Sequence, residues 1–315
     1  MKKLKKHDTI RVFEGFAGYG GASFGLKRAG IKHEIVGYSE FDKFASALYD
    51  ANHKDKNGNP IKNWGDITAI NPDELPDFDL FTGGFPCQPF STVGMQQGEK
   101  DQYGRGTLLY DIIRICAAKK PKYIFLENVK GLATKRFEGT FNTLKNALKE
   151  LGYGDLKCAI LNTKDYGIPQ NRERIYIVAF RDDIDSTWFR FPQPTNPDTV
   201  LKDIMEENPV PAKYYLSETY LQTLKNHKAR HAAKGNGFGY EIRAWDDIAG
   251  AIVCGGMGRE RNLVIDKRQK NLTPTTHIKG TINKEGVRKM TPREWARLQG
   301  FPDSFVLPLA DTHLY

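Results

Sequence analysis

Cys87 is the residue best suited to covalent chemistry, and it lies in the segment 83–91 (GGFPCQPFS). Two glycines and two prolines around one cysteine cannot continue a strand or a helix, so the chain must turn there. The apolar run 78–82 before the turn predicts a buried strand, which places the thiol at a carboxyl end, where open α/β sheets bind ligands. A thiol on a rigid turn is a candidate nucleophile, whereas a lone cysteine is more often a buried structural residue. From this segment alone both interpretations stay open.

Glu127 is a candidate proton donor, because it ends the apolar segment 123–126, which predicts another buried strand. A carboxyl group at the end of an apolar strand can hold a proton near neutral pH. The alternative is a carboxylate that pairs with an arginine for stability. Arg172 and Arg174 are two positions apart before the predicted strand 175–180, so both would lie on one face and supply positive charge. Their alternative is an ion pair with a neighbouring acidic residue.

A glycine-rich turn, 14–21 (EGFAGYGG), separates the predicted strand 9–13 from a helical pattern. Glycines let a backbone approach a ligand closely, and the helix N-terminus offers free N–H groups to an anion. The third glycine of the G-x-G-x-x-G dinucleotide pattern is missing, since Ser23 stands in its place. Taken alone, this turn is a weak nucleotide signal.

Three residues after the next predicted strands suit an adenosine ligand. Glu40 follows the predicted strand 35–39, about 20 positions past the glycine turn, where an acidic residue binds ribose hydroxyls. Phe41 beside it could stack on an adenine ring. Asp66, in a predicted third strand at 64–67, could accept a hydrogen bond from the adenine amino group. The alternatives are a helix N-terminal carboxylate for Glu40 and a turn residue for Asp66.

The remaining pattern predicts an α/β domain and an irregular region. Helices are expected at 107–119 and 141–151, and a strand at 159–162. The long polar loop 88–106 is typical of a functional loop. Periodicity weakens from about 185 to 286, where the glycine-rich loop 255–262 could enter a DNA groove or form a plain hairpin. A capping box with Pro at the first helical position then starts a helix at Thr291.

Composition limits the class of protein. The chain has 315 residues and a formal net charge of +9, which favours a polyanionic partner. Its four cysteines form no C-x-x-C pair, which predicts reduced thiols in a cytoplasm and no zinc knuckle. His227 and His231 have no acidic or thiol neighbour, so no metal site is expected. No signal-peptide core and no apolar run near the ~20 residues of a membrane span are present, so no membrane partner is expected.

Taken in order, these segments resemble the DNA cytosine-5 methyltransferases. The shared motifs are 16–21 (FAGYGG), 40–41 (EF), 65–67 (GDI), 84–88 (GFPCQ), 127–129 (ENV), 170–174 (QNRER), and Arg288 with 291–302 (TPRE through GFP). The resemblance implies a doubly wound mixed α/β sheet of Rossmann-like type with a smaller, mostly irregular or β domain that reads DNA. It assigns 1–184 plus 287–315 to the catalytic domain and 185–286 to target recognition.

The resemblance also implies the chemistry. Cys87 would add to carbon 6 of a flipped-out cytosine, Glu127 would hold ring nitrogen 3, and Arg174 with Arg172 would orient both. S-adenosylmethionine would be the methyl donor, duplex DNA the substrate, and bacterial or phage restriction–modification the role. The donor pocket would be lined by Phe16, Gly18, Gly20, Glu40, Phe41, Asp66, Ile67 and Pro86. The residues expected to contact DNA are Gln88, Ser91, Arg105, Arg259 and Arg261.

One family feature is missing from the sequence. Family members end with a glycine-asparagine motif and a helix that completes the donor pocket, and no such motif follows the segment 291–302; the Gly235-Asn236 dipeptide lies in the expected recognition region and is not counted. Three explanations stay open: a truncated chain, a second polypeptide that supplies the end, or a differently built pocket. Two further functions are weighed against DNA methylation. Transfer RNA is one alternative substrate, against which the ~100-residue recognition region argues, and a DNA-binding protein without activity is the other.

Overall fold

The structure is a computed structural model that describes residues 9–85, 108–237, 239–253, 258–273 and 280–314. The chain divides into two compact units. Unit 1 comprises Met1–Leu161 and Glu173–Pro192, and unit 2 comprises Asn162–Arg172 and Gln193–Tyr315.

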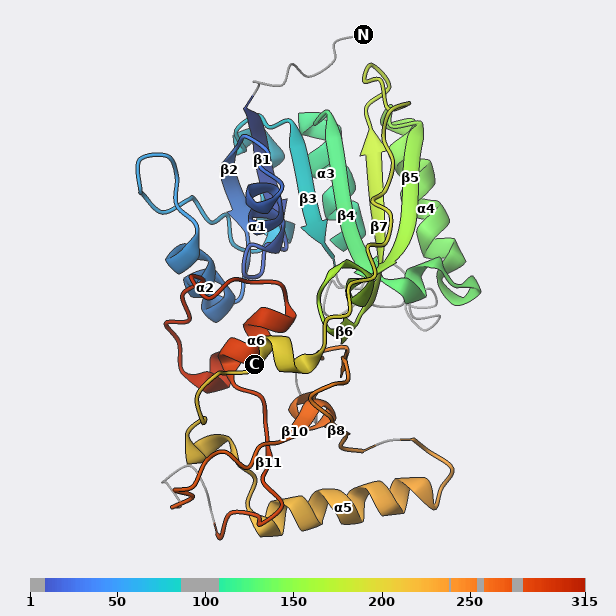
Figure 1. Ribbon diagram of the computed structural model, residues 1–315. Helices are drawn as coiled ribbons and strands as arrows, with labels where there is room; N and C mark the ends of the chain where they lie inside the picture. Colours follow the sequence, from blue (N-terminus) through green and yellow to red (C-terminus); the bar gives the residue numbers. More distant parts are fainter. Residues whose placement is uncertain (1–8, 86–107, 238, 254–257, 274–279, 315) are drawn as a thin grey trace. The chain divides into compact units, whose positions relative to one another are not determined.

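Unit 1 is built around a six-stranded sheet with the order β2-β1-β3-β4-β7-β5 (Figure 1). The first four strands in this order are parallel, and β7 pairs antiparallel with β4, so the sheet is mixed. Its elements are β1 (Ile10–Gly15), α1 (Gly21–Arg28), β2 (His33–Ser39), α2 (Lys43–Asn52), β3 (Leu80–Gly84), α3 (Leu108–Lys119), β4 (Tyr123–Val129), α4 (Glu138–Glu150), β5 (Asp155–Asn162) and β7 (Glu173–Phe180).

Both faces of this sheet are covered. In Figure 1, α1 lies in front of the strands, whereas α3 and α4 lie behind them. The larger core packs the apolar faces of α3 and α4, including Ile112 and Leu148, against Phe81 and Ile124 of the strands. A smaller core stacks Tyr49 of α2 on the β2 end. The predicted doubly wound mixed sheet is therefore confirmed.

The expected third strand at 64–67 is wrong. Gly65 has φ +69°, a left-handed conformation that a strand does not contain, and Ile67–Ala69 form a 3₁₀ helix. The side chain of Asp66 caps that helix by accepting from Thr68 N. The third strand of the sheet is instead β3, which the apolar run before Cys87 predicted.

Unit 2 has little regular structure. Its strands form a three-stranded sheet, β11-β10-β8, and a pair, β6-β9. Three small apolar clusters take the place of one core. Its elements are β6 (Gln170–Asn171), α5 (Glu218–Ala232), β8 (Ile242–Arg243), β9 (Ala249–Gly250), β10 (Leu263–Ile265), β11 (Val287–Arg288) and α6 (Pro292–Leu298).

Of the residues 287–315 that the motifs assigned to the catalytic domain, the described ones, 287–314, lie in unit 2. Trp295 and Leu298 of α6 share an apolar cluster with Leu201 and Val264. The helix starts where the capping box predicted, with Thr291 Oγ1 accepting from Glu294 N. No helix in the described ranges is long and apolar enough to cross a membrane.

Candidate active site

The predicted site segments follow the parallel strands of unit 1 at one edge of the sheet. From β1 the chain passes to β2 on one side and then returns to β3 on the other, so the strand order reverses between β1 and β3. Gly15 pairs with Gly83 at this point. In doubly wound sheets the ligand crevice lies outside the carboxyl ends at such a switch point.

Glu40 joins the glycine turn to the end of β2. Its Oε2 accepts a hydrogen bond from Gly18 N at 2.9 Å, and its Oε1 accepts from Asp42 N at 2.8 Å. The N-cap of α2 is Asp42, whose carboxylate accepts from Phe44 N and Ala45 N. The helix-capping role weighed for Glu40 therefore belongs to its neighbour.

The glycine turn has a tightly specified backbone. Phe16 has φ +54°, which costs a non-glycine residue about 1–3 kcal/mol and persists only where the surroundings impose it. Gly20 has φ +81°, and a Cβ there would lie 2.1 Å from His53 Nε2, a ring atom 3.0 Å from Tyr19 O. Only glycine fits at position 20 without displacing His53.

The two predicted donor-pocket residues at the 3₁₀ turn, Asp66 and Ile67, differ in exposure. Asp66 is exposed, and its Oδ1 accepts from both Thr68 N and Thr68 Oγ1 at 2.9 Å. This is the turn role that was the alternative for Asp66, and it leaves the residue at the surface. Ile67 is only 3% exposed and packs into the core beside Gly15.

A buried carboxyl group below the glycine turn was missed by the sequence analysis. Glu14 is 1% exposed, and it accepts hydrogen bonds from Ser23 N at 2.8 Å and from Tyr49 Oη. Burial raises the pKa of Glu14 to about 7, against the lowering effect of these two hydrogen bonds. The sequence placed Glu14 in the turn 14–21, whereas the structure places it in β1, so no local signal marked its burial.

Glu14 should make stability depend on pH. Its folded pKa lies above the unfolded value of 4.5, so the folded state holds the proton more tightly. The stabilisation is complete below pH 4.5 and is lost as the pH rises through about 7, a change of roughly 3 kcal/mol. We expect Glu14→Gln to flatten the fall in unfolding free energy over this window. Urea titrations from pH 4.5 to 8 would show this, and parallel curves for both proteins would contradict it.

Glu127 lies against the strand that leads to Cys87. It pairs with Gly84 in the β3–β4 register, and a Cβ on Gly84 would lie 3.3 Å from Glu127 Oε2. Arg174 Nε lies 2.8 Å from Glu127 Oε1. This ion pair agrees with the alternative interpretation, in which Glu127 pairs with an arginine for stability. It also agrees with a catalytic acid whose carboxyl group is oriented by the guanidinium of Arg174.

Arg172 and Arg174 belong to different compact units. Arg172 Nη1 donates to Ile252 O at 3.3 Å within unit 2, whereas Arg174 meets Glu127 within unit 1. The structure thus brings Arg174 to Glu127, and one contact of Arg172 is with the carbonyl of Ile252. Glu173 between them pairs with Lys130.

Asn128 holds the end of β3. It is 2% exposed, and its Nδ2 donates to Phe85 O at 2.9 Å. Phe85 is the last described residue before the nucleophile segment. Pro86, Cys87, Gln88, Ser91 and Arg105 lie outside the described residues, as does the side chain of Arg259.

Comparison with known proteins identifies the family. A family model described as C-5 cytosine-specific DNA methylase matches residues 10–315. The chain belongs to this family.

Two relatives of the methylase are bacterial. The Type II methyltransferase M.HpaII of Haemophilus parainfluenzae is 50% identical over 306 residues, which cover 95% of this chain and 82% of that protein. The Type II methyltransferase M.HhaI of Haemophilus parahaemolyticus is 34% identical over 320 residues, covering 99% and 90%.

A solved structure shares the fold of the methylase. A DNMT2 mutant of Spodoptera frugiperda superposes with a TM-score of 0.71 at 20% identity, covering 97% of this chain and 93% of that one.

The methylase uses S-adenosylmethionine as its methyl donor, and unit 1 fits an adenosyl group. A Cβ atom placed on Gly18 would have no neighbouring atom within 4 Å, so a ligand can approach the turn on this side. The ring of Phe41, next to Glu40, is 83% exposed. An exposed aromatic ring beside a carboxylate suits a base and its ribose.

The part of the predicted glycine-rich loop 255–262 that the structure describes is a short helix. Gly258–Asn262 form a 3₁₀ helix in which Glu260 is buried, accepts from Tyr220 Oη at 3.1 Å and pairs with Lys289 at 3.1 Å. Arg261 on the same turn is half-buried. The segment is therefore anchored at its centre.

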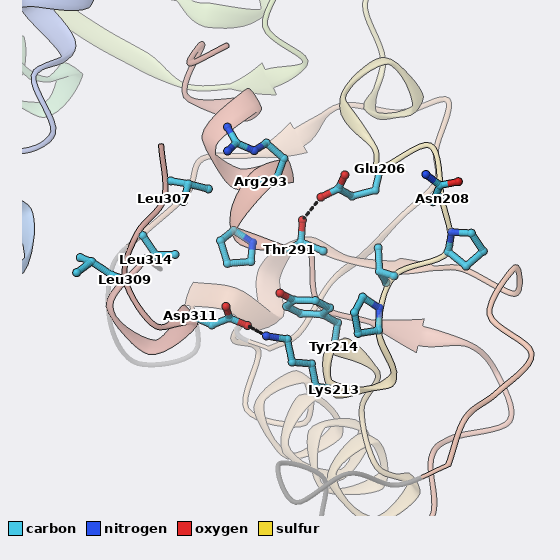
Figure 2. Close-up of a pocket in the computed structure, with 14 residues that line it drawn as sticks. Glu206, Asn208, Lys213, Tyr214, Thr291, Arg293, Leu307, Leu309, Asp311 and Leu314 are labelled. Carbon is cyan, nitrogen blue, oxygen red and sulfur yellow. Dashed lines mark hydrogen bonds and ion pairs between the residues drawn. The ribbon is translucent and has the colours of Figure 1, made fainter. Parts of the chain in front are cut away.

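Unit 2 also holds a cavity of about 470 Å³ between the 206–214 segment and α6 (Figure 2). It contains none of the predicted site residues. Lys213 pairs with Asp311 at 2.6 Å, and Thr291 Oγ1 donates to Glu206 at 3.2 Å. Among the described residues, no group of three or more His, Cys, Asp or Glu could hold a metal ion.

Proposed function

We propose that this methylase transfers a methyl group to carbon 5 of a cytosine within a short, specific duplex sequence. It would protect DNA in the cytoplasm of a bacterium or phage host from a partner restriction endonuclease. The Type II methyltransferases at 50% and 34% identity support this role. The observation that carries the proposal is Glu127, placed against Gly84 and paired with Arg174 at the carboxyl edge of the sheet.

Glu127 and Arg174 would receive the base. The carbon atoms of a stacked cytosine cannot be reached, so the base must leave the duplex, at a cost of a few kcal/mol. Glu127, in its protonated form, would donate to ring nitrogen 3 and balance the charge that develops there. Arg174 would keep the carboxyl group oriented.

Cys87 would supply the nucleophile. Its thiolate adds to carbon 6, and the displaced electron pair makes carbon 5 nucleophilic. S-adenosylmethionine, when bound, supplies an electrophilic methyl group on a sulfonium. The carbon 5–methyl bond would form as the methyl–sulfur bond of the donor breaks, with S-adenosylhomocysteine as the leaving group. A base would then remove the carbon 5 proton, the carbon 6–sulfur bond would break, and its electron pair would return to Cys87. A free thiol has a pKa near 8.5, so positive charge near the site would favour the thiolate.

The donor and DNA residues follow from the same assignment. Phe16, Glu40, Phe41 and Asp66 would surround the donor, with Pro86 closing the pocket. Residues 1–184 plus 287–315 would carry catalysis, and 185–286 would read the sequence, with Arg259 and Arg261 at base edges. Gln88, Ser91 and Arg105 would contact phosphates or the flipped base.

Whether a second polypeptide completes the donor pocket can be tested directly. Titration of the 315-residue chain with S-adenosylmethionine by calorimetry should show binding if these residues suffice. Binding that appears only after a polypeptide with the family's glycine-asparagine motif is added would support the two-chain alternative.

Arg174→Lys should reduce kcat by roughly 10–100-fold, because a lysine keeps the charge but cannot reproduce the planar guanidinium contact with Glu127. The Michaelis constants for donor and DNA should change little. Steady-state kinetics with a radiolabelled donor would measure both. An unchanged kcat would exclude Arg174 from the proposed orienting role.

Bisulfite sequencing of plasmid from an expressing host tests the whole proposal. We expect protected cytosines at one short sequence, at the same position in every copy. A host that expresses the Cys87→Ser variant is the control. Complete conversion in both samples, with folded protein present, would refute the proposed function.

A further inference from the structure

We infer that Asn63 and Arg114 are positioning residues that hold the adenosine-binding edge of the methylase in its binding geometry. Neither lies in a motif that carried the family resemblance. The inference rests on the proposed donor pocket, in which Glu40 and Asp66 bind the ribose and the adenine. It concerns how the segments that bear these two residues are held together.

Asn63 connects the two segments through its side chain amide. Its Oδ1 accepts from Glu40 N at 3.1 Å and from Gly65 N at 2.9 Å. Its Nδ2 donates to Glu40 O at 2.9 Å and to Ser46 Oγ at 3.0 Å. Three of these four bonds go to the backbone of Glu40 or of Gly65, which precedes Asp66, and the fourth goes to Ser46 of α2.

Arg114 holds the other side of the adenine segment. From α3 its Nη2 donates to Ile67 O at 2.6 Å and to Thr68 O at 3.2 Å, and its Nη1 donates to Ile70 O. Asp111, one turn earlier on the helix, orients the guanidinium through Nε at 2.7 Å. Two carbonyls of the short helix that Asp66 caps, and the carbonyl of its C-cap Ile70, are therefore bonded to α3.

Together the two side chains make the segment 63–70 a rigid support. Other bonds to β2 are few: Asn63 forms a bridge with Tyr38, Trp64 N donates to Tyr38 O at 2.7 Å, and Ser39 Oγ donates to Gly65 O at 2.7 Å. These bonds end at Gly65, so without the bonds of Asn63 and Arg114 the separation of Glu40 and Asp66 would be less restricted. If the donor pocket must become ordered when the donor binds, its affinity for the donor falls. The rate of the steps that follow donor binding does not change.

The test is a set of near-isosteric variants. Asn63→Asp keeps the acceptor oxygen Oδ1. It replaces Nδ2, which donates hydrogen bonds to Glu40 O and Ser46 Oγ, by an oxygen that cannot donate. Arg114→Lys keeps the charge but cannot bind three carbonyls at once. We expect each to raise the KM for S-adenosylmethionine and the Kd of S-adenosylhomocysteine by about 10–100-fold. The kcat at saturating donor and the Kd for DNA should stay within about twofold.

Two matched controls separate positioning from general destabilisation. Asn283 is a buried amide in unit 2 that bonds Leu216 O, Val287 O and Val287 N, so Asn283→Asp removes comparable contacts far from any proposed donor residue in the sequence. Arg181 binds Lys120 O and Asp183, and Arg181→Lys matches Arg114→Lys. Both controls should lower thermal stability without changing the donor KM. Equal KM increases in variants and controls would overturn the inference.

A third substitution separates this inference from the proposed pocket. Glu40→Gln alters the carboxylate itself. If Glu40→Gln leaves donor affinity unchanged, the proposed donor pocket is wrong, and the inference falls with it. If Glu40→Gln weakens the donor but both Asn63→Asp and Arg114→Lys bind it normally, the pocket stands and the inference alone is wrong.

Discussion

Cys87→Ser is expected to reduce methyl transfer by roughly 10³-fold or more, which is the scale on which losing a covalent nucleophile acts. A serine hydroxyl remains protonated and cannot add to carbon 6 at neutral pH. Binding of DNA and of the donor should survive, because neither requires the thiolate. Incorporation of labelled methyl groups into duplex DNA, with gel-shift titrations alongside, would measure both properties.

Cys158→Ser is the matched control for Cys87→Ser. Cys158 is an exposed free cysteine in β5, so its substitution should leave activity unchanged. Duplex DNA with fluorine at carbon 5 adds a second readout. Because fluorine cannot leave as a proton does, the native enzyme should accumulate a covalent adduct that the Cys87→Ser variant cannot form. Normal methylation by that variant would refute the mechanism.

Arg288→Met is expected to lower the unfolding free energy by about 3–5 kcal/mol, because it leaves the buried Glu294 carboxylate without its cation, whereas Asp266 keeps its pair with Arg268. Arg288 is 0% exposed. Its Nη1 and Nη2 donate to the two oxygens of Glu294 at 2.7 and 2.8 Å, and its Nε donates to Asp266 at 3.1 Å. The network links β11 to the first turn of α6, so unit 2 should be the part that loosens.

Arg181→Met is a suitable comparison for Arg288→Met. Arg181 also makes a two-point pair, with Asp183, but at the surface, where such pairs contribute about 0.2–1 kcal/mol. Urea unfolding of both variants, followed by hydrogen exchange of unit 2 amides, would compare them. If both variants lowered the unfolding free energy equally, burial of Arg288 would not increase the stabilisation that its ion pairs provide.

The sequence by itself determined most strands of the sheet and the place of Glu127 near the carboxyl end of one of them. Apolar runs bounded by glycine and proline predict β1, β2, β3 and β4, because a buried strand leaves a local hydrophobic signal. The capping box Thr291–Glu294 also predicts the start of α6, because its hydrogen bonds join residues within one helical turn and are therefore a local signal. The placement of Glu127 at a strand end follows from position along the chain alone.

Only the tertiary structure decided which groups meet. The Glu127–Arg174 pair joins residues 47 positions apart, and the bonds from Asn63 to Glu40 span 23. The predicted strand at 64–67 failed because Asp66 and Gly65 close a turn there, which apolar content does not reveal. Arg172 and Arg174 look equivalent in the sequence, yet they contact different units. Such contacts depend on how the chain returns on itself, and no local pattern of residues encodes that return.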